Sequence, residues 1–374
     1  MAHTLDLFSD FPPVTASDWL AKISQDLKGK ALADLEWQVE SIKVSPFPHL
    51  EDLKGMPAPL PTGTGWEIGE DIEAHDLLLA NKQVRQALEM GVQAPRFIIV
   101  ENLGDHRMAS LLEGIHLPIV SVHFFEKNKN AAPRRLLEHF YHIARDTGQL
   151  EDGPLKGSVN WAYDDAVVME DAFELVEYAQ SKLPDFKVLP VNGHAYFGEG
   201  ATVTELAHTI HRAVHWLDGL EEKGVQVAEA NRFLFFSLSI GTNYFVEIAK
   251  LRALRLLWAN VMRAYGVENA VMPFVETHLS PGTQAGNQHD NMIKATVQAM
   301  SAIIGGADRL TVLPSDAFTG RATDFSRRIA RNVQHILSLE SHFDWVADPA
   351  AGSYFIESLT EKLATAAWKV FQEL

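Results

Sequence analysis

The stretch Thr277–Asp324 reads THLSPGTQAGNQHDNMIKATVQAMSAIIGGADRLTVLPSDAFTGRATD and contains one complete structural unit. The apolar run Ala270–Val275 before it predicts a buried strand, and a loop rich in Gly, Pro and Ser follows. Apolar residues at helical spacing then predict a helix whose stripe faces a core. That stripe consists of Ile293, Val297, Met300 and Ile304. Gly305-Gly306 ends the helix, and Leu310–Leu313 predicts the next buried strand.

Polar residues gather where the first of these strands is expected to end. They are His278, Asn287, His289 and Asp290. Ligands of β/α proteins bind beyond the carboxyl ends of the strands, so this loop is a candidate binding site. Exposed N–H groups at the helix start could hold a phosphate or a carbonyl oxygen. Alternatively, Asn287 or Asp290 is simply an N-cap. Both interpretations remain open.

Length and composition exclude several classes of protein. A chain of 374 residues can bury the core of one β/α barrel with extensions. The absence of cysteine excludes disulfides, cysteine nucleophiles and thiolate metal sites. A net charge of −17 argues against nucleic acid or an anionic membrane as a partner, although local Arg and Lys could still bind an anion. The sequence lacks a long apolar span and a basic signal-peptide start, so we expect a cytoplasmic protein.

From Trp66 onward, short apolar runs alternate with helical patterns. The predicted strands are Trp66–Ile68, Arg96–Leu103, Ile119–Glu126, Gly157–Trp161, Phe186–Asn192, Phe233–Ile240, Ala270–Thr277 and Leu310–Pro314. The predicted helices are 73–91, 105–115, 131–145, 165–182, 202–222, 242–265, 288–304 and 324–340. The strands lack polar alternation, as parallel strands buried on both faces do. The pattern predicts an α/β fold, a (β/α)8 TIM barrel. A doubly wound sheet is the alternative, but no Gly-x-Gly-x-x-Gly follows an early strand.

Three regions are expected. Residues 1–60 form an N-terminal arm that must pack on the barrel or on another chain, with a helix over Ser17–Lys30 capped by Ser17 and a short strand around Trp37. Residues 61–343 form the barrel. Residues 344–374 form a C-terminal extension with a short strand at Ser353–Ile356 and a helix from Ser358 onward.

Further residues could carry chemistry. His194 follows the fifth predicted strand, where it is either a general acid or base or a structural loop histidine. Arg232 lies at the head of the sixth strand and either pairs with a carboxylate or binds an anionic ligand. Three histidines share one face of a predicted helix. They lack an HExxH spacing and a carboxylate in register, so we expect no metal site there. They are His208, His211 and His215.

Several segments together resemble the methylmalonyl-CoA mutases, the adenosylcobalamin-dependent acyl-CoA isomerases. The matching segments are Gly200-Ala201-Thr202 with Glu205-Leu206-Ala207, Tyr244–Ala253 with Leu256-Leu257-Trp258, Thr323–Ser326 with Ile329–Asn332, and Asp348–Tyr354. The resemblance covers roughly residues 60–374 and implies a barrel with acyl-CoA threaded along its axis. Arg232 matches a family arginine associated with CoA binding.

The departures from the family pattern concern its catalytic positions. Family members that catalyse carry Tyr-His after the glycine that ends strand five, whereas Gly193 is followed here by His194-Ala195. The resemblance therefore puts Ala195 at the catalytic histidine's place. Glu276-Thr277-His278 replaces Arg-Thr-His, and Leu234 replaces a serine near Arg232. The Asp-x-His-x-x-Gly motif that supplies the cobalt ligand does not occur.

Taken together, the resemblance implies the non-catalytic small subunit of a heterodimeric mutase. We expect it to stabilise a large catalytic subunit that its arm embraces, to bind no adenosylcobalamin itself, and to lead into a cobalamin-binding-like domain beyond residue 374. Residues expected to contact substrate, if any do, are Arg232, His278, Asn287 and His289, and no metal ligand is expected. Two alternatives remain, an active isomerase that uses His194 and a barrel that binds CoA esters without converting them.

Overall fold

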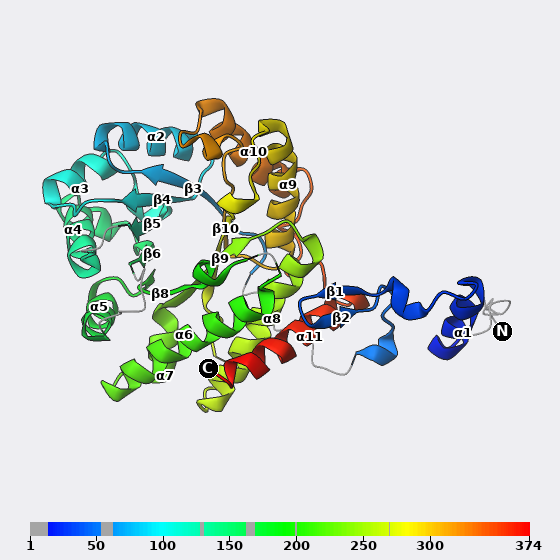
Figure 1. Cartoon of the computed structure of the whole chain (residues 1–374). Helices are drawn as coiled ribbons and strands as arrows, with labels where there is room; N and C mark the ends of the chain where they lie inside the picture. The colour runs from blue at the N-terminus through cyan, green and yellow to red at the C-terminus, as the bar shows by residue number, and fades with distance from the viewer. Residues whose placement is uncertain (1–13, 54–62, 128–130, 162–168, 199, 269) are drawn as a thin grey trace, which may run out of the picture.

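The computed structural model describes residues 14–53, 63–127, 131–161, 169–198, 200–268 and 270–374. Its main sheet is a ring of parallel strands around one axis (Figure 1). The strands are β3 (Glu67–Glu73), β4 (Ala94–Ile99), β5 (Ser121–Glu126), β6 (Lys156–Asn160), β7 (Phe186–Lys187), β8 (Leu189–Asn192), β9 (Leu234–Ile240), β10 (Phe274–Leu279) and β11 (Arg309–Thr311). β11 pairs with β3, so the order β7-β6-β5-β4-β3-β11-β10-β9-β8 runs around the ring.

The ring closes through β7 and β8, which form one interrupted strand. Val188 separates them: its N–H donates to the Phe233 carbonyl at 2.9 Å, and its carbonyl accepts from the Trp161 indole at 2.9 Å. β7 pairs with β6 and β8 pairs with β9. Counted this way the barrel has eight strands, which confirms the predicted (β/α)8 class.

Helices cover the outside of the barrel after each strand. They are α2 (Leu77–Glu89), α3 (Asp105–Leu112), α4 (Pro133–Asp146), α5 (Met169–Lys182), α6 (Thr202–Glu222), α8 (Tyr244–Ala264), α9 (Gln288–Ile304) and α10 (Asp324–Leu339). The predicted ranges 202–222 and 288–304 match α6 and α9 in full. A short helix before β9, α7 (Val227–Phe233), was not predicted. Within the described ranges, no helix combines the length and the apolar character needed to cross a membrane.

The prediction that the apolar stripe of α9 faces the core is confirmed for Met300 and Ile304, which pack against the core clusters, and is wrong for Ile293 and Val297. Ile293 is 68% and Val297 39% exposed. The buried face carries small residues and satisfied polar ones instead, among them Ala295, Ala299 and Gln298, whose amide donates to the Ile240 carbonyl at 2.8 Å. Small side chains let this part of the helix approach the barrel closely, so Ile293 and Val297 remain on the outer side.

The N-terminal segment extends away from the barrel (Figure 1). Helix α1 (Ala16–Asp26) is capped by Thr15 rather than by the predicted Ser17, because Thr15 accepts from the Asp18 N–H at 3.2 Å. None of its residues is buried. The strands β1 (Trp37–Val39) and β2 (Ile42–Val44) form a hairpin that packs on the C-terminal helix. Only the first of these two strands was predicted.

The strand predicted at Ser353–Ile356 does not form. Ser353 is the N-terminal boundary residue of helix α11 (Tyr354–Phe371), which runs along α8 and α6 (Figure 1). Leu359, Leu363 and Ala367 recur at helical spacing and are buried in that contact. An apolar face with the repeat of an α-helix thus packs on α6 and α8. That packing explains why the helix begins before the predicted Ser358.

Candidate functional site

The barrel axis is lined by charged side chains. Arg96 on β4 binds Asp71 on β3 through two hydrogen bonds of 2.8 and 2.9 Å. The same guanidinium lies 2.8 Å from Nε2 of His278 and 3.6 Å from a carboxylate oxygen of Glu276, both on β10. Strands from opposite ends of the sequence thus bring their inward-facing residues into one network. His278 lies within β10, not in the loop after it.

Glu276 is the centre of this network. It accepts a hydrogen bond from Ser237 Oγ at 2.7 Å and lies 3.2 Å from His278 Nε2. Arg309 on β11 reaches it at 3.4 Å and also donates to the Ala94 carbonyl. A Cβ on Gly69 would come within 2.9 Å of the Arg309 guanidinium, so the absence of a side chain there makes room for this arginine.

Burial and neighbouring charges set the ionisation of these groups. Burial alone would raise the pKa of Glu276, but His278, Arg96 and Arg309 outweigh it and hold that pKa well below its usual value. Burial, together with Arg96, lowers the pKa of His278. Two arginines therefore face the carboxylates of Glu276 and Asp71, while the histidine between them stays neutral at neutral pH.

This network fills the middle of the axis. The side chains of Arg309 and Glu276 are 0% and 1% exposed, and that of Arg96 is 8% exposed. Because each charge is paired inside the barrel, an elongated ligand could follow the axis only by separating buried ion pairs. Removing one partner of such a pair costs about 3–5 kcal/mol. The axis is a packed, charge-balanced core.

His194 lies at the carboxyl end of this core. It belongs to a short 3-10 helix, Gly193–Tyr196, directly after β8. Burial, with His278 and Arg96 nearby adding to it, lowers the pKa of His194 to about 4. Its side chain therefore faces the charged network, whereas Ala195 is exposed. The ring sits above an occupied axis and is a neutral hydrogen-bonding group at physiological pH.

The other candidate residues lie apart from the axis. Arg232 ends α7 at the amino side of β9, and it is half exposed and paired with Glu229 at 3.1 Å. Asn287 caps α9 by accepting from the His289 N–H at 3.0 Å, which confirms its cap role. His289 itself is exposed. The structure therefore brings His194 and His278 together but not Arg232, Asn287 or His289.

Two of the family-like segments meet in a buried ion cluster. Lys250 on α8 is fully buried and lies 3.1 Å from Glu205 on α6 and 2.7 Å from Glu247. It also donates to the Ser239 carbonyl at 2.7 Å. Burial raises the pKa of Glu205 to about 7 despite the lysine. These side chains join α6 and α8 to β9, so this part of the resemblance reflects packing.

A hollow opens at the carboxyl ends of β3 and β11. It has a volume of about 550 Å³, and Asp71, His75 and Arg321 are among its lining residues. Arg327 and Arg331 reach it from α10, but both are paired with Glu70, at 3.1 and 2.6 Å. The hollow is large enough for a small molecule or part of a larger one.

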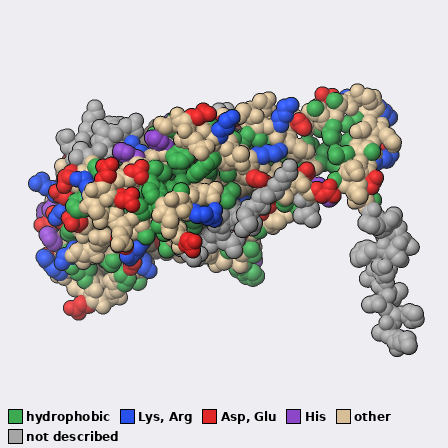
Figure 2. Space-filling view, turned by 90° about the horizontal axis from the view of Figure 1, so that it is seen from below, with side chains coloured by type: hydrophobic (Ala, Val, Ile, Leu, Met, Phe, Trp, Pro, Cys, Tyr) green, Lys and Arg blue, Asp and Glu red, His purple; other side chains and the backbone are tan. Residues whose placement is uncertain are grey.

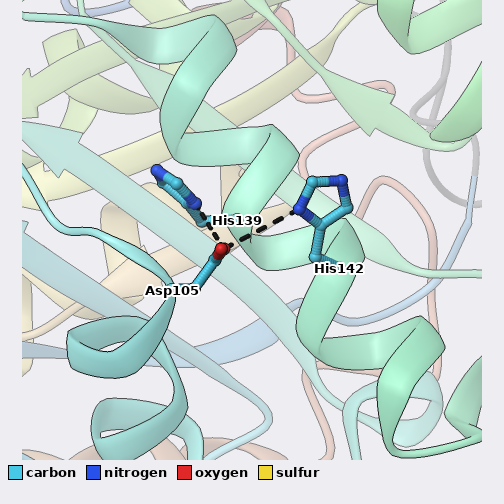
Figure 3. A group of neighbouring side chains, drawn as sticks. All are labelled: Asp105, His139 and His142. Carbon is cyan, nitrogen blue, oxygen red and sulfur yellow. Dashed lines mark hydrogen bonds and ion pairs between the residues drawn. The ribbon is translucent and has the colours of Figure 1, made fainter.

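Sequence reasoning missed a group on the outer surface. Asp105, at the start of α3, meets His139 and His142 on α4 (Figure 3). The signal that could have found it is the i, i+3 spacing of the two histidines on the predicted helix 131–145. The histidines that the sequence did single out make ring contacts instead: His208 stacks on Tyr196, and His211 meets Phe371 edge-on.

Comparison with known proteins identifies the family. The family described as methylmalonyl-CoA mutase matches residues 106–374. The chain belongs to the methylmalonyl-CoA mutase family. It is 35% identical to the methylmalonyl-CoA mutase small subunit of Porphyromonas gingivalis, over 98% of this chain and 63% of that protein. It is 34% identical to a probable small subunit of Mycobacterium tuberculosis, over 83% of this chain and 52% of that protein.

A third relative has the same description. The methylmalonyl-CoA mutase small subunit of Streptomyces virginiae is 31% identical, over 99% of this chain and 65% of that protein. The chain thus spans between about half and two thirds of the length of these mutase relatives. Adenosylcobalamin is the cofactor at the level of the family.

Proposed function

We propose that the chain is the substrate-barrel part of a methylmalonyl-CoA mutase small subunit. In this proposal it performs no turnover and stabilises a large catalytic subunit in a cytoplasmic heterodimer. That heterodimer interconverts methylmalonyl-CoA and succinyl-CoA in propionate metabolism. Residues 1–60 act as the partner-binding arm, 61–343 as the barrel, and 344–374 lead towards a cobalamin-binding-like domain. The observation that carries the proposal is the occupied barrel axis.

The occupied axis opposes substrate binding for a physical reason. A family substrate would have to lie where Arg96, Glu276 and Arg309 now neutralise one another. Displacing them would separate buried ion pairs, which is costly. Ala195, which the resemblance puts at the catalytic histidine's place, can neither donate nor accept a proton. We assign no catalytic residue to this chain.

The described residues also do not fit the family's cofactor together with its substrate. Adenosylcobalamin supplies the rearrangement chemistry of the family, and that chemistry must reach a substrate on the barrel axis. In this chain the carboxyl end of the axis carries His194, with His278 and Arg96 nearby. No catalytic step is therefore derived for this barrel.

The arm offers the surface that a large subunit would need. Trp19 is 40% exposed and Phe47 43% exposed, and their rings meet edge-on at 5.0 Å. They line a groove of about 850 Å³ between α1, the segment after β2 and α11. Hydrophobic side chains also gather on the arm at the right of Figure 2. Aromatic anchors in a groove commonly dominate binding energy between proteins.

The test is reconstitution with a large mutase subunit. We expect this chain alone, supplied with adenosylcobalamin and methylmalonyl-CoA, to form no succinyl-CoA, and we expect it to raise the melting temperature of the large subunit. Trp19→Ala should weaken that association by about tenfold or more, because aromatic hot spots contribute about 2 kcal/mol. Leu78→Ala is the control, because Leu78 is an exposed apolar residue on α2, away from the arm. Turnover by the isolated chain would refute the proposal and favour an active isomerase with His194 in the catalytic role.

A second candidate function is CoA-ester binding without conversion. The hollow beside β3 and β11 favours it, because it remains open while the axis does not. Titration of the chain with methylmalonyl-CoA distinguishes the two. Saturable binding that Arg321→Ala abolishes would support CoA-ester binding. If titration produces no change in heat or fluorescence, this candidate is refuted and stabilisation of the large subunit remains as the proposed function.

A further inference from the structure

Three potential metal ligands converge on the outer surface of the barrel. Asp105 begins α3, and His139 and His142 lie one helical turn apart on α4, so both rings face the same carboxylate (Figure 3). His139 Nδ1 is hydrogen bonded to Asp105 Oδ1. His142 Nδ1 lies 3.7 Å from that same oxygen. The three ligand atoms lie within 4.8 Å of one another, so small side-chain movements would bring all three to one ion.

The cluster is accessible and charged. The side chains of His139, His142 and Asp105 are 25%, 41% and 61% exposed, so an ion can reach them from solvent. The two imidazoles compete for one carboxylate oxygen, and a cation between the three groups would satisfy all of them.

A second, independent feature lies beside the cluster. A cavity of about 200 Å³ is lined by His139, Gly104 and Glu126, among others. Glu126, at the end of β5, is 1% exposed, and its Oε1 accepts from the Ala132 N–H at 3.3 Å. Its Oε2 is buried and has no hydrogen-bond partner among the described residues. A buried acceptor without a partner is destabilising, and a water in the cavity would relieve that cost.

We propose that Asp105, His139 and His142 bind a divalent transition metal ion of the Zn²⁺ class. Two imidazole nitrogens and one carboxylate oxygen suit Zn²⁺, Co²⁺ or Ni²⁺, whereas Ca²⁺ and Mg²⁺ require oxygen ligands. Three protein donors leave one tetrahedral position for water. The cavity provides room for that water, and Glu126 Oε2 provides a hydrogen-bond acceptor for it.

The bound ion would link α3 to α4. At present this contact includes the His139–Asp105 hydrogen bond, which any competing water can replace. A metal bound to ligands from both helices stabilises the folded chain, because the unfolded chain does not hold the three groups together. The metal should therefore raise the melting temperature even in the absence of any substrate or partner subunit.

The test is a metal titration of the full chain after removal of metals with a chelator. We expect calorimetry to detect one Zn²⁺ ion per chain, and Co²⁺ to give a visible absorption spectrum typical of mixed nitrogen and oxygen ligands. His139→Ala and His142→Ala should each weaken binding by at least about tenfold, and Glu126→Gln, which acts through the bound water, by about tenfold. His211→Ala on α6 is the control and should leave the affinity within about twofold.

Asp105→Asn provides a variant that preserves shape and should also weaken binding. Circular dichroism of each variant checks that it is folded, and Zn²⁺ should raise the melting temperature of the wild type but not of His139→Ala. Binding of equal strength in the wild type and in His139→Ala would overturn the proposal, as would a loss of affinity in His211→Ala as large as that in His139→Ala. In either case the cluster is only a surface ion pair.

Discussion

The barrel axis buries and pairs its charged side chains, whereas the N-terminal arm leaves its aromatic side chains exposed. On the axis, Arg96, Glu276 and Arg309 are buried and each is paired within the chain. In the arm, α1 buries none of its residues, and Trp19 remains 40% exposed. Under the proposed function, paired charges occupy the barrel interior and the exposed arm provides the binding surface. Recognition by the arm, rather than chemistry in the barrel, is what this arrangement favours.

The largest expected effect comes from breaking the axis network. Glu276→Ala would leave Arg309 and Arg96 buried with one carboxylate, Asp71, between them. We expect the free energy of unfolding to fall by about 3–5 kcal/mol, measured by urea denaturation. The control is Asp26→Ala, which removes the exposed pair with Lys22 on α1 and should cost at most about 1 kcal/mol. Equal losses in the two variants would mean that the axis is no more tightly paired than the arm.

A smaller effect is expected where the arm is attached to the barrel. Glu40, in the turn of the β1–β2 hairpin, accepts a hydrogen bond from the Val203 N–H at 2.8 Å. Val203 lies in the first turn of α6, which has no side-chain cap of its own. Glu40→Ala should therefore cost about 1 kcal/mol, as the loss of a helix cap does.

Hydrogen exchange at the Val203 amide measures this attachment directly. Exchange should become faster in Glu40→Ala and remain near the wild-type rate in Glu40→Gln, whose side-chain carbonyl can still accept the bond. If both variants exchange like the wild type, the hairpin is not held by this contact but by others, such as the packing of Trp37 on Phe355 and the hydrogen bond from Lys362 to the Lys43 carbonyl.

The sequence predicted the fold more completely than the site. Short apolar runs and helical periodicity gave the barrel and the full range of α6, because both signals are local. The same reasoning failed for part of α9, where Ala295 and Ala299 rather than the larger Ile293 and Val297 face the core. Periodicity identifies an apolar face, but close packing can select a face of small residues instead.

The site depended on contacts between distant segments. His194 and His278 could be placed on the ligand side of the barrel from their strands alone. Arg96 and His278, however, are 182 residues apart, and their contact follows from the register of the strands around the ring. No local pattern marked Arg96, Glu276 and Arg309 as partners. The sequence singled out Glu276 only because it departs from the family pattern. Its pairing with Arg309 and Arg96 became visible only in the structure.

The last expected effect is a change in pH dependence confined to the axis. The pKa of His194 is about 4 in the folded chain, and the groups that face it are His278, Arg96 and Glu276. Its ordinary value in an unfolded chain is about 6.5. Between these two values the unfolded chain binds a proton at His194 and the folded chain does not. Stability must therefore fall as the pH decreases through this interval.

Replacing His194 tests whether the axis, rather than the arm, is sensitive to acid. His194→Gln keeps a polar side chain but removes the titration, so its stability should decline less steeply than that of the wild type between about pH 6.5 and 4. At pH 7.5 neither side chain is charged, and the comparison there measures only the change in packing. Denaturation curves across this range provide the slopes. If the two slopes are equal, His194 is not held neutral above the paired charges, and the axis must be more open at its carboxyl end than these contacts imply.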